Sequence, residues 1–310
     1  MTSAQHKKRV RVIAVCLGSA LLYSCATAPV PDGSIDNSIR PNLPSETTFN
    51  KEAGNGGNLL NGDLLYLTLR LEDGENLLFL MDTGSDSTTL DKSLEAKLGK
   101  RLGTTTLNWD YSAGKRTSGV YETPKLYLGG TRLLLDDQIT TDDLSRILSG
   151  QSSIKGVLGM DCLRHYCIQL DFAARKMRFL DPDHLQTARL GKAFPIANFS
   201  GEISTCTNFF GLMNTRFSVD TGCTLDGALK LKLFQQELRK QTAVATNVTT
   251  TAGVSLVRVA FFEKVMFDGN VYRHVIISEC PDENMIGLRF LARYLVTFNF
   301  PKQTMYLLSR

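Results

Sequence analysis

Two Asp-Thr-Gly triplets are the residues of this chain best suited to chemistry. Asp82-Thr-Gly84 ends the apolar run 77–81, and Asp220-Thr-Gly222 ends the similar run 217–219, 138 positions further on. One such triplet usually marks only a turn, but two copies that close similar strands are a specific signal. Two carboxylates held close together cannot both ionise, so one keeps a proton while the other acts as a base. The pattern therefore indicates acid–base chemistry on a water molecule, without a metal or a covalent intermediate.

The segments around the triplets also repeat, which predicts two related halves. The recurring pairs are Leu126–Gly130 with Val265–Gly269, Val157–Met160 with Met285–Leu288, and Ile168–Phe172 with Val296–Phe300. Offsets that stay near 130 over several elements are typical of a duplicated unit rather than a short repeat. Alternating apolar residues between Gly-bearing turns predict mainly β structure in both halves.

Several elements are expected to position the triplets. The first half should hold strands at 64–71 and 76–81, a short helix near 93–98, and hairpins over 126–135 and 168–180. In the second half, the strand 212–219 leads into Asp220, and a longer helix is expected from Asp226 to about Lys240. We assign residues 58–185 to an N-terminal lobe and residues 186–310 to a C-terminal lobe.

On these residues the chain resembles the aspartic peptidases, specifically the pepsin-like and retropepsin-like group. The resemblance covers most of residues 58–310. It implies two homologous lobes with a cleft between them, where the two loops share one water. It also implies an aspartic endopeptidase with Asp82 and Asp220 as catalytic residues and a peptide or protein as substrate. Because one chain supplies both loops, we expect a monomer.

The resemblance gives roles to the residues beside the two carboxylates. Thr83 and Thr221 would hydrogen-bond across the lobe interface and lock the loops together. Gly84 and Gly222 would allow the sharp turns that bring backbone N–H groups to the carboxylates.

The two loops differ at the position after the triplet. Ser85 can donate a hydrogen bond to Asp82, whereas Cys223 is a poor donor at the equivalent place. That difference leaves Asp220 less stabilised as an anion, so we expect Asp220 to be the protonated partner.

A flap is expected over the substrate. Residues 107–119 are polar and Gly-bearing between strand-like flanks, and the resemblance implies a mobile hairpin there. Trp109, Tyr111 and Gly114 are the expected substrate-binding residues of this flap. A hydrophobic contact under a loop is the alternative role for the two aromatic residues. The segment 249–253 occupies the corresponding place in the second half.

Residues 1–25 are typical of an export signal. A basic start is followed by an apolar core of 11 residues, Val12 to Leu22, whereas a membrane-spanning helix needs roughly 20. Leu22-Tyr-Ser-Cys25 resembles a bacterial lipobox. We therefore expect a lipid on Cys25 and a place on the periplasmic side of the outer membrane; an ordinary cleaved signal is the alternative. Residues 26–57, rich in Pro and Gly, are expected to form a flexible tether.

Composition limits the expected partners. The chain carries 35 basic and 31 acidic residues, and four of the basic residues lie in the leader, so the exported part has no net charge. Nothing in this balance predicts a nucleic-acid partner. The four histidines show no metal-ligand spacing, and we expect neither a metal nor a cofactor. Cys162 and Cys167 are close enough to form a disulfide, with two buried thiols as the alternative.

Two alternatives to a general endopeptidase stay open. One is a catalytically inactive periplasmic lipoprotein that binds peptides or assists assembly through the same cleft. The other is a processing enzyme for one dedicated partner. Hydrolysis by Asp variants, measured beside peptide binding, separates the enzyme from the binder.

Overall fold

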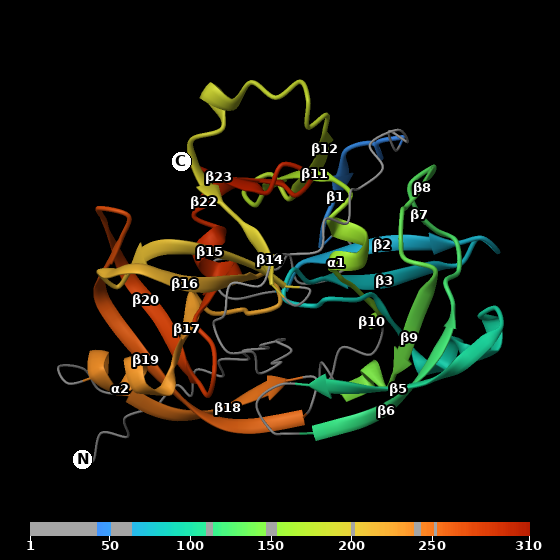
Figure 1. Ribbon diagram of the computed structural model, residues 1–310, viewed down its shortest axis with the longest axis horizontal. Helices are drawn as coiled ribbons and strands as arrows, with labels where there is room; N and C mark the ends of the chain where they lie inside the picture. Colours follow the sequence, from blue (N-terminus) through green and yellow to red (C-terminus); the bar gives the residue numbers. More distant parts are fainter. Residues whose placement is uncertain are drawn as a thin grey trace, which may run out of the picture.

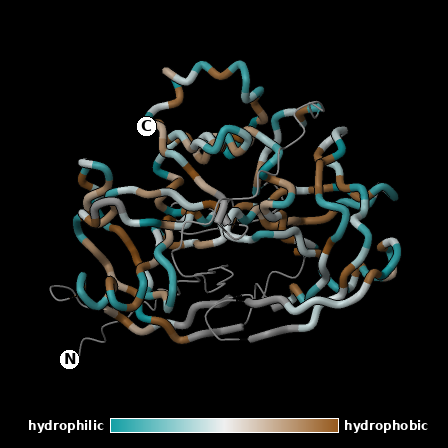
Figure 2. Tube along the Cα trace, viewed as in Figure 1, coloured by the Kyte–Doolittle hydropathy of each residue, from teal (hydrophilic) through white to brown (hydrophobic). Residues whose placement is uncertain are grey.

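The computed structural model describes residues 42–50, 64–109, 114–146, 154–199, 202–238, 243–250 and 253–310. The chain is mainly β, as predicted, with one large sheet in each lobe and a third sheet that contains strands from both (Figure 1). Hydrophobic residues lie mainly along the strands, and the outer turns are hydrophilic (Figure 2). Among the described residues, no helix is long and apolar enough to cross a membrane.

The first lobe is built on a nine-stranded sheet in the order β5-β6-β9-β4-β10-β3-β2-β7-β8. Its strands are β2 (Tyr66–Leu71), β3 (Asn76–Met81), β4 (Thr89–Asp91), β5 (Arg101–Trp109), β6 (Gly114–Glu122), β7 (Leu126–Leu128), β8 (Thr131–Arg132), β9 (Gln138–Asp142) and β10 (Ile154–Leu158). In the described part of this lobe, the sheet is accompanied by the short helices η2 (Lys92–Lys97), η3 (Leu144–Arg146) and α1 (Met160–Leu163). The strands expected at 64–71 and 76–81 and the short helix near 93–98 are therefore present.

The second lobe is built on an eight-stranded sheet in the order β14-β15-β16-β21-β17-β20-β19-β18. Its strands are β14 (Ala197–Phe199), β15 (Glu202–Phe209), β16 (Leu212–Asp220), β17 (Gly227–Lys230), β18 (Ala243–Thr250), β19 (Gly253–Phe267), β20 (Asn270–Cys280) and β21 (Met285–Gly287). The helices are α2 (Leu231–Glu237) and α3 (Leu288–Leu291).

The helix expected from Asp226 to about Lys240 is shorter than predicted. Residues 227–230 form β17, which pairs with β20 on one side and β21 on the other, and the helix begins only at Leu231. A Cβ atom on Gly227 would lie 2.1 Å from the Met285 carbonyl oxygen. This segment is therefore a tightly enclosed central strand, because its backbone groups are used by both neighbouring strands.

The third sheet joins the lobes in the order β1-β12-β11-β22-β23-β13. Its strands are β1 (Thr47–Thr48), β11 (Cys167–Asp171), β12 (Lys176–Leu180), β13 (Lys192–Pro195), β22 (Tyr294–Asn299) and β23 (Thr304–Ser309), and η4 (Thr187–Arg189) lies between β12 and β13. The hairpins β11–β12 and β22–β23, predicted as counterparts, meet through the β11–β22 pairing. Within that pairing the Gln169 side-chain amide donates a 3.1 Å hydrogen bond to the Thr297 hydroxyl.

Part of the segment expected as a tether packs against the first lobe. Thr47 and Thr48 pair with β12, and Phe49 is fully buried against Phe172. The Asn50 side chain donates a 2.9 Å hydrogen bond to the Leu64 carbonyl and accepts one of 2.7 Å from the Tyr66 N–H. Residues 42–50 thus belong to the folded body, and residues 51–63 lie outside the described part of the chain.

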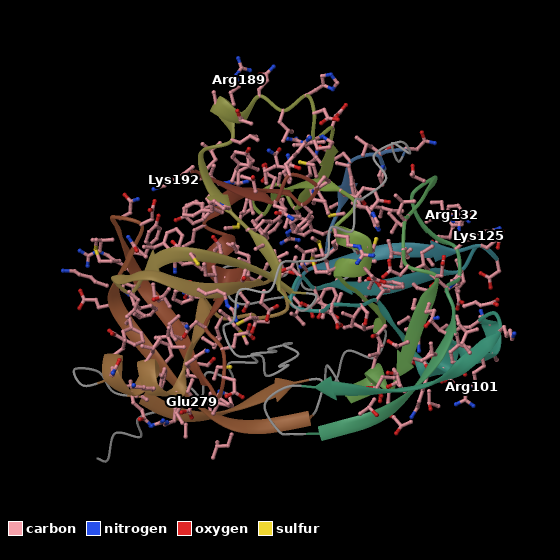
Figure 3. The ribbon with its side chains drawn as sticks, in the orientation of Figure 1. Arg101, Lys125, Arg132, Arg189, Lys192 and Glu279 are labelled. Carbon is pink, nitrogen blue, oxygen red and sulfur yellow. The ribbon has the colours of Figure 1, made fainter. Side chains whose placement is uncertain are left out.

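One hydrophobic core runs through both lobes and under the third sheet. Its largest buried members include Phe79, Phe209, Phe217, Phe290 and Phe298. Charged residues lie at the periphery, where the labelled side chains point away from the body of the fold: Arg101, Lys125, Arg132 and Arg189 (Figure 3). The continuous core fixes the two lobes relative to one another, and thereby the two triplets.

Candidate active site

The strand that ends at each triplet is paired with a second strand, which is inserted between two neighbours in the same way in both lobes. In the first lobe, β10 pairs parallel with β3 and antiparallel with β4. In the second lobe, β21 pairs parallel with β16 and antiparallel with β17. The predicted apolar-Gly elements are these inserted strands, and they pass directly beside the two Asp loops.

The glycine that ends each inserted strand lets it approach the loop closely. A Cβ atom on Gly159 would lie 2.5 Å from the Ser87 backbone, and one on Gly287 would lie 2.3 Å from the Leu225 carbonyl oxygen. Behind the loops, the Met160 N–H donates to the Ser85 carbonyl over 2.8 Å. Any side chain at the glycine positions would push the loops away from their supporting strands.

The two loops are joined by a reciprocal pair of buried threonines. The Thr83 N–H donates to the Thr221 hydroxyl over 3.0 Å, and the Thr221 N–H donates to the Thr83 hydroxyl over 3.1 Å. Each hydroxyl in turn donates across the interface, from Thr83 to the Val219 carbonyl over 2.6 Å and from Thr221 to the Met81 carbonyl over 2.9 Å. Four hydrogen bonds thus hold the ends of β3 and β16 together.

This connection brings Asp82 and Asp220 into direct contact in a buried place. Asp82 is 0% exposed and Asp220 is 1% exposed, and the two carboxyl groups interact. The Gly84 N–H donates to Asp82 Oδ1 over 2.8 Å, and the Gly222 N–H donates to Asp220 Oδ1 over 2.7 Å. Gly222 also lies against the other lobe's carboxyl, because a Cβ atom there would be 2.8 Å from Asp82 Oδ1.

Burial disfavours ionisation of this pair. It raises the pKa of Asp82 to about 7, while hydrogen bonds from the Gly84 N–H, with the Asp220 carboxyl and from the Gly222 and Ser85 N–H groups oppose that effect in part. Asp220 Oδ1 receives a second backbone hydrogen bond, because the Cys223 N–H donates to it over 3.2 Å.

The expectation that Asp220 holds the shared proton stays a prediction; the hydrogen bond with the Asp220 carboxyl lowers the pKa of Asp82, which is the direction that this expectation requires. The expectation rested on side-chain donors at the position after each triplet. The Ser85 hydroxyl instead donates to the Ser87 carbonyl over 2.9 Å, and the donor found at the second loop is the backbone N–H of Cys223. A backbone donor cannot be inferred from the type of a side chain.

The flap residues are only partly within the described structure. Trp109 and Gly114 are paired at the ends of β5 and β6, which form the expected hairpin; Tyr111 lies outside the described residues. A second hairpin, β18–β19, occupies the corresponding place in the other lobe and pairs Thr250 with Gly253. In Figure 1, the β5–β6 hairpin and β18 project toward each other on the side away from the third sheet.

Sequence reasoning missed a buried polar group behind each loop. In the first lobe, the Thr88 hydroxyl donates to Asp161 Oδ1 over 2.6 Å and accepts from the Gly159 N–H over 3.1 Å. In the second lobe, the buried Asp226 is paired with Arg289 and Arg293. Asp161 lies two residues after Gly159, and Arg289 lies two residues after Gly287. This shared position in the repeat is the sequence signal that could have identified these two buried groups.

The remaining sequence candidates do not form a further site. Cys162 and Cys167 are buried thiols and are not joined by a disulfide. In the described part of the chain, no group of three or more His, Cys, Asp or Glu residues is arranged to hold a metal ion.

Comparison with known proteins defines the class of fold. No family model and no curated protein matches this sequence. Among solved structures, the chain is similar to the aspartic proteinase from Irpex lacteus, with a TM-score of 0.53 and 13% sequence identity. The alignment covers 86% of this chain and 96% of that proteinase. The chain thus has the two-lobed, mainly β fold of the pepsin-like aspartic proteinases, as the repeated triplets predicted.

Proposed function

We propose that this protein is an aspartic endopeptidase that hydrolyses peptide bonds with a water activated between Asp82 and Asp220. One observation carries the proposal. Two carboxyl groups from corresponding strands of two related lobes are buried in contact, locked by the reciprocal hydrogen bonds of Thr83 and Thr221. Burying two carboxyl groups together opposes folding unless they share a proton, and a shared proton is what general acid–base hydrolysis uses.

The two members of the pair take different roles. The ionised carboxylate takes a proton from the attacking water. The protonated carboxyl donates its proton to the carbonyl oxygen of the peptide. Attack of the resulting hydroxide on the carbonyl carbon gives a tetrahedral intermediate. Its breakdown, with protonation of the leaving amine, restores the pair.

This assignment sets the expected pH dependence. Burial raises the pKa of Asp82, which is coupled to Asp220, to about 7, so below that pH the pair retains one proton and holds both an acid and a base. As the pH rises through that value, the pair loses this proton and the acid is lost. Hydrolysis is therefore expected to decline on the alkaline side of neutrality.

Asparagine substitutions test the proposal. Asp82→Asn and Asp220→Asn should each abolish hydrolysis of a mixed peptide library, and the double variant should be no worse than either single one, because the pair acts as a unit. Folding should survive, since an asparagine Oδ1 can still accept the Gly84 or Gly222 N–H. Asp183→Asn, an exposed aspartate beside Lys302 in the loop before β13, is the matched control and should leave hydrolysis unchanged.

The same experiment separates the enzyme from a peptide-binding lipoprotein. A binder would give no product with the wild-type chain at any pH and nearly unchanged peptide affinity in both asparagine variants. Retained cleavage in either asparagine variant would refute the two-carboxylate mechanism.

We further propose that the protein is anchored through a lipid on Cys25, on the periplasmic side of the outer membrane. The support is the basic start, the short apolar core and the Leu22-Tyr-Ser-Cys25 motif of the sequence. A single chain contributes both carboxylates, so the site is complete without a second copy, and a monomer acting on peptide or protein substrates fits the proposal.

A further inference from the structure

A buried ion cluster in the second lobe is connected to the Asp220 loop. Asp226 is fully buried and lies six residues after Asp220. Its carboxylate is paired with Arg289 and with Arg293, the latter over 2.9 Å. Arg289 lies in α3, and Arg293 lies two residues beyond the end of that helix. Asp226, Arg289 and Arg293 are here called the ion cluster.

The backbone of Cys223 connects Asp220 to the same helix. The Cys223 N–H donates to Asp220 Oδ1 over 3.2 Å, and the Cys223 carbonyl accepts from the Leu288 N–H over 2.7 Å. At the other end of the loop, the Asp226 carbonyl accepts from the Gly287 N–H over 2.9 Å. A shift of Asp226 relative to α3 would therefore displace the N–H group that contacts the candidate catalytic carboxyl.

The Asp226 side chain also fastens the loop to β20. Asp226 Oδ2 accepts from the Ile276 N–H over 2.8 Å, and the Asp226 N–H donates to the Ile276 carbonyl over 3.1 Å. Arg289 donates to Asp226 Oδ2 and, over 3.0 Å, to the His274 carbonyl. His274 has a φ of 55°, a left-handed conformation that is unfavourable for a residue other than glycine. Arg289 thus holds the loop and a strained point of β20 together.

The first lobe makes the same connection with other residue types. Thr88 lies six residues after Asp82, Asp161 lies two residues after Gly159, and the Thr88 hydroxyl donates to Asp161 Oδ1 over 2.6 Å. There the loop supplies a neutral hydroxyl and the helix a carboxyl group. In the second lobe the loop supplies the carboxylate and the helix a guanidinium. Because the two positions recur while their chemistry differs, the connection between them is the shared feature of the two loops.

We propose that Asp226 and Arg289 are positioning residues, which hold the Asp220 loop in the geometry that hydrolysis requires. The inference rests on the proposed function and deepens it, because it names what fixes the second-lobe carboxyl of the pair. Both residues act through the backbone of Cys223. A misplacement of about 1 Å can lower a reaction rate by about 100-fold, so the rate should suffer more than substrate affinity.

Asp226→Asn in the full chain tests this inference. The variant removes the charge and keeps an oxygen that can accept from the Ile276 N–H. For a peptide that wild type cleaves, kcat should fall by about 10- to 100-fold, while KM stays within about 3-fold. A role in stability alone would lower the urea midpoint and leave kcat of the folded variant unchanged, and that result would overturn the inference.

Asp171→Asn is the matched control. Asp171, in the third sheet, is also paired with an arginine, Arg310, and accepts one backbone hydrogen bond, from the Ala174 N–H over 2.8 Å. Its replacement should leave kcat as in wild type.

An exchange of residue types gives a second, independent variant. Asp226→Thr leaves two arginines without their carboxylate, and Arg289→Asp places two carboxylates beside Arg293. The double variant Asp226→Thr/Arg289→Asp reproduces the first-lobe connection and keeps one carboxylate for Arg293. It should recover about 10-fold or more of the kcat lost in the poorer single variant. A folded double variant without this recovery would overturn the inference.

Amide hydrogen exchange separates this inference from the proposed function, because it needs no turnover. In Asp226→Asn, the amides of Gly222 and Cys223 should exchange about 10-fold or more faster than in wild type, and in Asp171→Asn they should exchange as in wild type. A lower kcat with unchanged exchange, or faster exchange with unchanged kcat, would overturn the inference and leave the enzyme proposal standing. Faster exchange in Asp226→Asn, with a wild-type chain that cleaves nothing, would support the hold on the loop and refute the enzyme.

Discussion

Replacing Thr83 by valine tests whether the reciprocal threonines hold the lobes together by hydrogen bonding. The Thr83 hydroxyl donates to the Val219 carbonyl over 2.6 Å and accepts from the Thr221 N–H over 3.1 Å. Valine has the same shape but cannot make either bond. Both backbone partners would remain buried without their hydrogen bonds, because Thr83 and Thr221 are fully enclosed.

The size of the effect follows from those two orphaned groups. A buried polar group that loses its partner costs roughly 1–3 kcal/mol, so the two groups orphaned by Thr83→Val should lower the free energy of unfolding by about 2–6 kcal/mol. Thr83→Ser removes only a methyl group and keeps the hydroxyl, so its loss should stay near ~1 kcal/mol. Hydrophobic packing alone predicts the reverse order, since valine retains the volume that serine loses.

Urea unfolding of the two variants decides between these accounts. Thr89→Val is the control, because the Thr89 hydroxyl forms a partly buried hydrogen bond of 2.9 Å with the Thr140 hydroxyl, within the first lobe and away from the lobe interface. Its cost should be below about 1 kcal/mol. Equal stability of Thr83→Val and Thr83→Ser, or a valine variant as stable as wild type, would refute the hydrogen-bonding account.

Two further predictions concern a buried carboxyl and the leader. Burial raises the pKa of Asp161 from its usual 3.8 to about 6. Between these pH values the folded chain keeps a proton that the unfolded chain releases. The free energy of unfolding therefore falls as the pH rises through this window, by ~3 kcal/mol in total. Asp161→Asn should flatten this dependence and unfold at higher urea concentration at neutral pH; an unchanged slope between about pH 4 and 7 would assign the dependence to other groups. Cys25→Ser should move the protein from the membrane fraction to the soluble fraction or leave its leader uncleaved, and a variant that is processed and still sediments with membranes would contradict lipid anchoring.

The sequence by itself determined the class of fold and the position of the candidate site. Apolar alternation and Gly-bearing turns are local patterns, so strands such as β2 and β3 and the short helix η2 could be predicted near their observed bounds. The duplicated triplets and apolar-Gly elements predicted the two lobes, because a repeat in the sequence indicates two related units even when their contacts are not known. The residues placed beside the candidate carboxylates came from the family resemblance at those same motifs.

Tertiary structure alone decided the features that depend on partners distant in sequence. Residues 227–230 form a strand rather than the start of a helix because β20 and β21 enclose them, and Phe49 is buried because the third sheet pairs with the residues just before it. The pKa of Asp82 is raised because burial outweighs the hydrogen bonds that it receives, and the backbone of Cys223 turns a second N–H toward Asp220. A pKa depends on the direction of nearby backbone groups and on solvent exclusion, and neither is encoded in the type of the neighbouring side chain.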